Sequence, residues 1–182
     1  MDRNKSWLER HITLHDHADE QAEVENAASH GIGVFGALVF IIIVMMRKPR
    51  LADSATFIGM LIYGATLLLL YLSSTLYHHV PRSDAKRFFR LLDHANIYLL
   101  IAGTYTPILF HVGSRTTFLL SALVWTIALC GILFSVAFWG RLKALHVVLY
   151  LAMGWMIVFF WDAVIPHIPS TLTWYIIDRK SV

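Results

Sequence analysis

Residues 55–77 read ATFIGMLIYGATLLLLYLSSTLY, and this stretch contains no charged side chain. About 20 mostly apolar residues are enough for an α-helix to cross the hydrocarbon core of a bilayer. The stretch therefore predicts a membrane-spanning helix. The length and apolar character of the segments on either side can be compared with those of this stretch.

The composition of the whole chain points to the same environment. Hydrophobic residues make up 57% of the 182 residues, and charged residues make up only 15%. Soluble domains carry roughly 25% charged residues. These values exclude a soluble globular enzyme and a disordered chain. Because Cys130 is the single cysteine, they also exclude a secreted module held together by disulfides.

Five apolar segments have about the length of a membrane span. They lie at residues 27–46, 55–77, 94–110, 117–139 and 144–161. A polar arm over residues 1–29 precedes a transmembrane domain over residues 30–161, and residues 162–182 are expected to form a loop and the remnant of a sixth span. We therefore expect an all-α, polytopic transmembrane helix bundle in which sequential helices are antiparallel neighbours.

The distribution of Lys and Arg predicts the orientation of the bundle. Nine of these residues fall on the side of the N-terminus, and four fall on the other side: Arg3, Lys5, Arg10, Arg82, Lys86, Arg87, Arg90, Arg141 and Lys143 against Arg47, Lys48, Arg50 and Arg115. Cytoplasmic loops carry the excess of Lys and Arg, so the N-terminus is expected in the cytoplasm. Basic residues in short loops indicate orientation rather than nucleic-acid binding, and the expected partners are membrane lipids.

Several ionisable side chains are expected at the cytoplasmic ends of the spans, among them His30, His78, Asp93 and His146. Ser74 and His78 are four residues apart and therefore share one face of a helix. His78 can offer a neutral imidazole to a metal ion, and Asp93 can accept a hydrogen bond from a metal-bound water or from the imidazole. An alternative interpretation makes Asp93 a helix cap and each histidine an interfacial residue. Spacing alone leaves both interpretations open.

Three strings carry a resemblance to a known family. Residues 23–33 read EVENAASHGIG, residues 73–78 read SSTLYH, and residues 93–107 read DHANIYLLIAGTYTP. Together and in this order they resemble the hemolysin III family, the bacterial branch of the progestin and adipoQ receptor superfamily. The resemblance implies seven helices with the N-terminus inside, in the plasma membrane of a bacterial cell.

The resemblance also implies a zinc ion near the cytoplasmic side. Carried over by motif, His78 is the zinc ligand on the second helix with Ser74 beside it, and Asp93 is the acidic residue that holds the zinc-bound water. Glu23 and Asn26 match the Glu-x-x-Asn signature before the first helix. The two remaining ligands belong to a His-x-x-x-His motif on the seventh helix. We expect the chain to be truncated before that helix, or a second copy of the chain to complete the site.

Three functions follow from the resemblance. The first is a zinc-dependent intramembrane hydrolase of lipid amides or esters, with Asp93 orienting or deprotonating the water and Ser74 donating to the developing oxyanion. The second is a membrane-permeabilising, cytolytic protein. The third is a receptor-like membrane-homeostasis protein in which zinc is structural. The sequence does not decide whether the protein is an enzyme.

Overall fold

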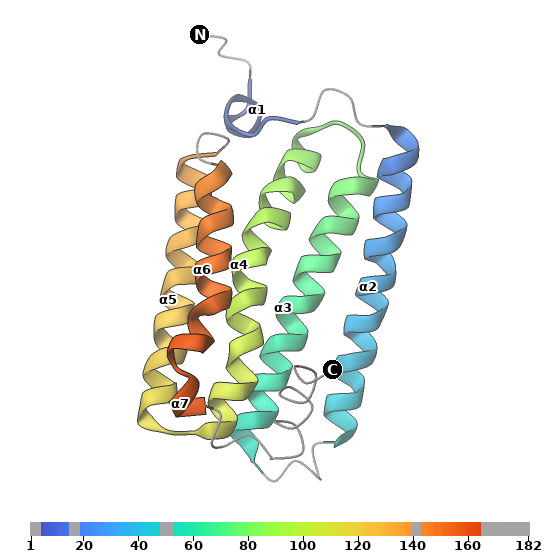
Figure 1. Cartoon of the computed structure of the whole chain (residues 1–182). Helices are drawn as coiled ribbons and strands as arrows, with labels where there is room; N and C mark the ends of the chain where they lie inside the picture. Colours follow the sequence, from blue (N-terminus) through green and yellow to red (C-terminus); the bar gives the residue numbers. More distant parts are fainter. Residues whose placement is uncertain (1–4, 15–18, 48–52, 140–142, 165–182) are drawn as a thin grey trace, which may run out of the picture.

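The computed structural model describes residues 5–14, 19–47, 53–139 and 143–164, and within these residues every regular element is a helix. The helices are α1 (Trp7–His11), α2 (Glu20–Arg47), α3 (Ser54–His79), α4 (Asp84–Val112), α5 (Arg115–Ala137), α6 (Lys143–Phe159) and α7 (Trp161–Val164). The long helices run up and down side by side, with α1 lying across one end of the bundle (Figure 1). The expected all-α, polytopic architecture is confirmed.

Four of the described helices, α2 to α5, are long and apolar enough to cross a membrane. The fifth expected span corresponds to α6, whose apolar part, Leu145–Phe159, is shorter than the others. A turn at Phe160 separates α6 from the four residues of α7. The remnant of a sixth span, expected near residues 172–177, lies outside the described residues.

Two helices begin earlier than the hydropathy pattern predicts. The interval 78–92 was expected to be a loop, but α4 already begins at Asp84, and the connection from α3 is only Val80–Ser83. The Ser83 hydroxyl caps α4 by accepting the backbone N–H of Lys86. Likewise α2 begins at Glu20, so the last residues of the polar arm form its first turns. Hydropathy marks where a helix enters lipid and not where it begins, which explains both differences.

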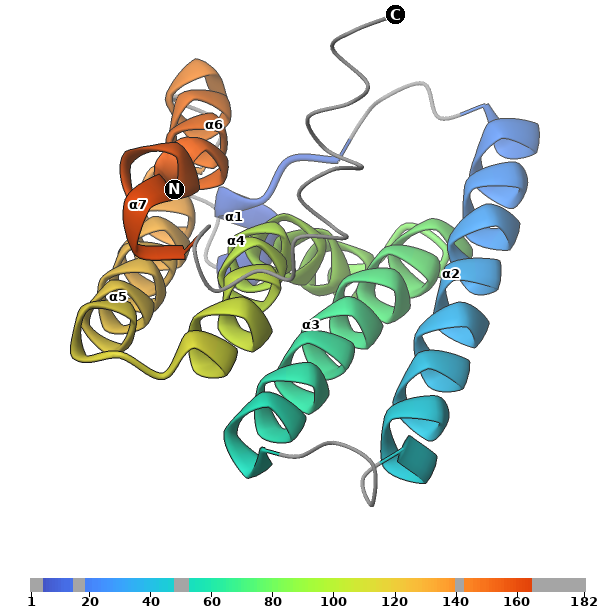
Figure 2. The ribbon, with the colours of Figure 1, turned by 60° about the horizontal axis from the view of Figure 1, so that its bottom comes forward.

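The helices form an open arc in which α4 is central. The main contacts of the long helices join neighbours along the chain, α2 with α3, α3 with α4 and α4 with α5, and α6 packs on α4 and α5. Viewed from the other end, α2 and the α5–α6 pair lie at opposite edges of the arc (Figure 2). The outer side of α2 exposes Ile32, Phe35 and Met46, each at least 69% exposed, as expected of a surface in contact with lipid.

The core lies between α4, α5 and α6, where Tyr98, Leu109, Val124 and Met153 are almost completely buried. The hydroxyl of Tyr105 joins α4 to α6: it donates to the Met153 carbonyl (2.7 Å) and accepts the Ile157 N–H (3.1 Å). These are the two backbone groups that an uninterrupted helix would pair with each other. Tyr105 therefore satisfies polar backbone groups that lipid cannot satisfy.

On the other side of α4, a glycine allows α3 to approach very closely. A Cβ atom at Gly59 would lie 2.7 Å from the Cα of Pro107, inside the distance that real Cβ atoms tolerate. Pro107 lies within α4, where it removes a backbone N–H. The small residue on α3 faces this position, as small residues do where membrane helices approach most closely.

At the end of the bundle opposite α1, Asp53 caps α3. Its carboxylate accepts the backbone N–H groups of Ala55 (3.0 Å) and Thr56 (3.1 Å) and the Thr56 hydroxyl (2.8 Å). The same hydroxyl lies 3.2 Å from the His111 Nδ1 near the end of α4. The hydrogen bond from the Ala55 amide, followed by those from Thr56, lowers the pKa of the Asp53 carboxyl below its ordinary value.

This lowered pKa predicts a pH-dependent contribution to stability. The Asp53 carboxylate stabilises the folded chain above its ordinary pKa of about 3.9, and this contribution is lost as the pH falls through the lowered value. Asp53→Asn keeps an acceptor but cannot titrate. The thermal unfolding midpoint of the wild type in detergent is therefore expected to exceed that of Asp53→Asn at neutral pH, and the difference should shrink below about pH 4. A difference that stays constant down to pH 3 would contradict this account.

Candidate functional site

A carboxylate on α2 joins the ends of three helices. The Glu23 Oε2 lies 2.6 Å from the Lys86 Nζ on α4, and its Oε1 lies 3.5 Å from the His78 Nδ1 on α3. The side chain of Lys86 is 9% exposed and that of Glu23 is 20% exposed. Charges this far from water require partners, so the three side chains form one coupled unit, which we call the Glu23 cluster.

The chain brings these residues together through the short turn between α3 and α4. His78 is the second-to-last residue of α3, and Lys86 is in the first turn of α4. With only Val80–Ser83 between the two helices, both side chains lie at one end of the bundle, where α2 also begins (Figure 1). The Lys86 ammonium further lies 5.1 Å from the ring centroid of Tyr77, a cation–π contact that helps to hold it.

The imidazole of His78 is held from two sides. The ring of His30, two turns after Glu23 on α2, stacks parallel to it with 5.8 Å between the ring centroids. The His78 Nδ1 atom is buried and faces the Glu23 carboxylate, yet among the described residues it makes no hydrogen bond of good geometry. Buried ring nitrogens are almost always satisfied, so this atom marks an unusual histidine.

The other predicted site residues are distributed around the cluster. Ser74 is buried on α3, one turn before His78. Asp93 is half-buried on α4, close enough to Tyr77 and to Tyr150 for its charge to act on both. In the described part of the chain, no hydrogen bond or ion pair joins Ser74 or Asp93 to His78.

Asn26 lies on α2 less than one turn after Glu23, and it is exposed. Its backbone carbonyl accepts the hydroxyl of Ser29 (3.0 Å). The structure therefore brings one residue of the Glu-x-x-Asn motif, Glu23, to His78 and leaves the other at the surface.

A hollow of about 510 Å³ opens beside the Glu23 cluster. Its lining residues come from the beginning of α2, the end of α3, the turn and the beginning of α4: Glu20, Glu23, Val24, His78, His79, Val80, Pro81, Arg82 and Lys86. The hollow thus combines carboxylates, imidazoles and basic side chains. Such a set can bind a polar group through both hydrogen-bond donors and hydrogen-bond acceptors.

The described residues do not by themselves complete a metal site. Among them, no group of three or more His, Cys, Asp or Glu side chains is arranged to hold a metal ion. Zinc sites use three or four protein ligands. His78 can therefore supply one ligand, and any further ligands would come from outside the described residues.

Sequence reasoning missed two members of this site. Lys86 was counted as one of the basic residues of a cytoplasmic loop, whereas it is buried against Glu23. Tyr77 was included as the last residue of the apolar segment 55–77, whereas its ring lies against Lys86 and Arg90. Lys86 follows Glu23 by 63 residues, and no local spacing signal connects them.

Together, the apolar helices and the polar cluster at one end of the bundle define a class: a multi-pass helical membrane protein with a partly buried site near one membrane surface. Comparison with known proteins identifies the particular family. The model of the Haemolysin-III related family matches residues 19–178, and the chain belongs to this family.

Two curated relatives are similar over three quarters of the chain. Hemolysin-3 of Bacillus cereus is 36% identical over 137 residues, which cover 75% of this chain and 63% of the relative. The Hemolysin-3 homolog of Bacillus subtilis (strain 168) is 43% identical over 140 residues, which cover 75% of this chain and 64% of the relative. The chain thus matches a little under two thirds of the length of these relatives. No solved structure matches it.

Proposed function

We propose that this chain carries one ligand of a zinc centre in a membrane hydrolase that cleaves an amide or ester bond of a lipid. The observation that carries the proposal is the position of Glu23 at the Nδ1 side of His78. The proposal also places the protein in a bacterial plasma membrane, with the Glu23 cluster at the cytoplasmic surface.

Metal-binding histidines usually point one ring nitrogen at the metal and the other at a carboxylate that fixes the ring. At His78, the carboxylate of Glu23 faces Nδ1, and Lys86 holds that carboxylate in place (2.6 Å). The stacked His30 ring restricts rotation of the imidazole. This arrangement favours Nε2 as the metal-binding atom, and it gives the Glu-x-x-Asn motif a role through Glu23.

Zinc bound there would polarise the substrate carbonyl and lower the pKa of a water molecule. Asp93 would accept a proton from that water, and Ser74 would donate a hydrogen bond to the substrate oxygen. The remaining zinc ligands would come from outside the described residues or from a second copy of the chain. All of these assignments are part of the proposal.

The zinc content of the purified chain tests the proposal. Wild type, His78→Gln and His79→Gln should be purified in detergent and measured by elemental analysis. We expect about one zinc ion per wild-type chain, its loss in His78→Gln and its retention in His79→Gln, because His79 is an exposed neighbour on the same helix end. Glu23→Gln should weaken zinc binding about 10- to 100-fold, as loss of a supporting carboxylate does elsewhere. A wild-type chain that binds no zinc, or His78→Gln with unchanged zinc, would contradict the proposal.

Release of fatty acid from lipid amides and esters in the same preparations tests the hydrolase part. Turnover should disappear in His78→Gln and should persist in a His11→Gln preparation, because His11 is exposed on α1 and does not line the hollow. If zinc binds through His78 but no lipid is cleaved, the metal is structural, and the receptor-like function is favoured instead.

Membrane permeabilisation is the second candidate function. It is favoured by the name of one relative, Hemolysin-3, which describes that protein and not this chain. Dye release from lipid vesicles would support it if release depends on the concentration of the folded chain. Vesicles that stay sealed across several lipid compositions would count against it.

A further inference from the structure

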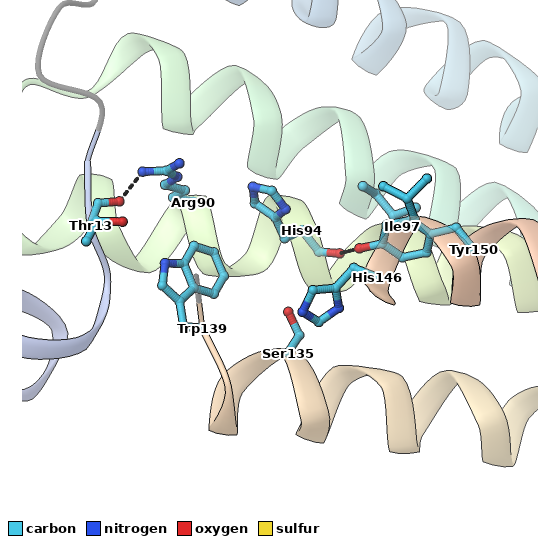
Figure 3. A pocket seen from close by; sticks show the side chains of 9 residues that line it. Thr13, Arg90, His94, Ile97, Ser135, Trp139, His146 and Tyr150 are labelled. Carbon is cyan, nitrogen blue, oxygen red and sulfur yellow. Dashed lines mark hydrogen bonds between the residues drawn. The ribbon is translucent and has the colours of Figure 1, made fainter. Parts of the chain in front are cut away.

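A second hollow, of about 280 Å³, lies at the same end of the bundle and has a different set of lining residues (Figure 3). Its lining residues come from the arm, α4, α5, the residues just after α5, and α6: Thr13, Arg90, His94, Ile97, Ser135, Trp139, His146, Val147 and Tyr150. None of these residues lines the hollow beside the Glu23 cluster. The family resemblance and the zinc proposal leave this second hollow without a function.

Arg90 carries the one permanent charge among the described residues that line the second hollow. Arg90 lines it together with two histidines, and no carboxylate is among the described lining residues. Asp93, which precedes His94 on α4, is the acidic residue whose charge acts on Tyr150 in the wall. A hollow that contains a fixed guanidinium and no carboxylate among its described lining residues attracts an anion.

Arg90 is held in a fixed position. It is only 7% exposed, and its guanidinium lies 5.8 Å from the Trp139 ring centroid and 6.0 Å from that of Tyr77. It donates a hydrogen bond to the backbone carbonyl of Thr13, as Figure 3 shows. A phosphate oxygen would be a stronger acceptor than this neutral carbonyl, because a guanidinium and a phosphate form charge-assisted, bidentate hydrogen bonds.

Further donors approach from the other helices. Ser135 on α5 is 3% exposed. The His146 Nδ1 on α6 is paired with the Tyr98 hydroxyl (2.9 Å), an arrangement that leaves Nε2 as the ring nitrogen for a ligand. The Tyr150 hydroxyl donates to the backbone carbonyl of His94 (3.2 Å), and this hydrogen bond fixes the Tyr150 ring in the wall of the hollow. Ligand sites of this kind combine a few oriented polar groups with an apolar wall.

The apolar part of the wall and the position of the hollow suit a lipid. Ile97 and Val147 line it alongside the ring of Trp139. Thr13, which follows α1, and Trp139, which follows α5, line the hollow, and α1 lies across this end of the bundle (Figure 1), so the hollow is near the level of lipid headgroups. Basic pockets between transmembrane helices at this level are typical sites for anionic headgroups.

We propose that this hollow binds the phosphate group of an anionic phospholipid, with Arg90 as the anchoring residue and Ser135 and His146 as further donors. The phosphate is the feature recognised, and it could be presented by a lipid or by free phosphate. The site does not depend on zinc or on the Glu23 cluster.

Binding to the full chain in neutral detergent tests this site. The probes are phosphatidylglycerol, diacylglycerol with the same acyl chains but no phosphate, and inorganic phosphate, with bound lipid counted by native mass spectrometry. Arg90→Gln should bind phosphatidylglycerol at least tenfold more weakly than wild type. The matched control is Arg87→Gln, which removes the same charge three residues earlier on α4, where Arg87 pairs with Asp84 outside the hollow. It should bind within twofold of wild type.

Because Arg90 also holds the arm, a second variant is needed in case Arg90→Gln does not fold. His146→Gln alters the hollow from α6 and should weaken phosphatidylglycerol binding about threefold. If millimolar inorganic phosphate displaces phosphatidylglycerol, the site binds a phosphate group whether or not a lipid carries it. If it does not, the site binds the phosphate group only as part of a lipid. Equal retention of diacylglycerol and phosphatidylglycerol would overturn the proposal. Equal losses in Arg87→Gln and Arg90→Gln would also overturn it.

Discussion

Replacing Glu23 with glutamine is expected to lower the free energy of unfolding by about 2 kcal/mol, because it removes the charged acceptor of a partly buried hydrogen bond from Lys86. Lys86 would keep its positive charge in a position that is only 9% exposed, with a neutral amide 2.6 Å away in place of the carboxylate. His78 would lose the group that faces its Nδ1 atom. The midpoint of thermal unfolding in detergent, and the detergent concentration that unfolds the chain, measure this loss.

Two companion variants separate the ion pair from other causes. Glu20→Gln removes a charge from the exposed first turn of the same helix and should change stability by less than about 0.5 kcal/mol. Lys86→Met in the Glu23→Gln background removes the stranded cation, so the double variant should be more stable than Glu23→Gln alone. Equal effects of Glu20→Gln and Glu23→Gln would show that the cluster does not stabilise the bundle.

Replacing Gly59 with alanine is expected to destabilise the chain by about 3 kcal/mol, the upper part of the range for overpacked sites. The added Cβ would lie 2.7 Å from the Cα of Pro107. Backbone atoms cannot rotate away as a flexible side chain can, so α3 and α4 would have to separate. Thermal unfolding and hydrogen exchange of both helices would detect the separation.

Gly36→Ala provides the matched control for this prediction. Gly36 lies on α2, and a Cβ there meets nothing within 4 Å. Both substitutions add one methyl group to a glycine within a membrane-spanning helix, so the difference between the two variants isolates the contact with Pro107. If both variants unfold at the wild-type temperature, the close approach of α3 and α4 does not limit stability.

The sequence predicts the membrane spans well, because the physical cause of a span is local. An uncharged stretch such as residues 55–77 has apolar side chains that favour lipid over water. In lipid, its backbone N–H and C=O groups can pair with one another only if the stretch is helical. The beginnings of α2 and α4 were predicted less well. Glu20–Ser29 and Asp84–Asp93 are helical although they are polar, since the cap at Ser83 and contacts between helices determine them, and hydropathy does not.

The candidate site was predictable only in part. His78 and Glu23 were identified through short motifs, and the structure brings them together. Lys86 was not identified, because its role depends on a pairing with Glu23 that only the folded chain creates. The roles assigned to Asp93 and Ser74 stay predictions, since nothing in the described residues links them directly to His78.

The neighbour-to-neighbour arrangement of the long helices bears on how the protein is made. Since the main contacts of the long helices join neighbours along the chain, helices that leave the ribosome in turn can pair in the order of their synthesis. The Glu23–Lys86 contact is an exception, because 63 residues separate its two charges. A nascent chain that has inserted only the α2–α3 hairpin carries Glu23 without its cation, and the pair closes only when α4 arrives. The contact therefore distinguishes a completed three-helix intermediate from a hairpin of α2 and α3 alone.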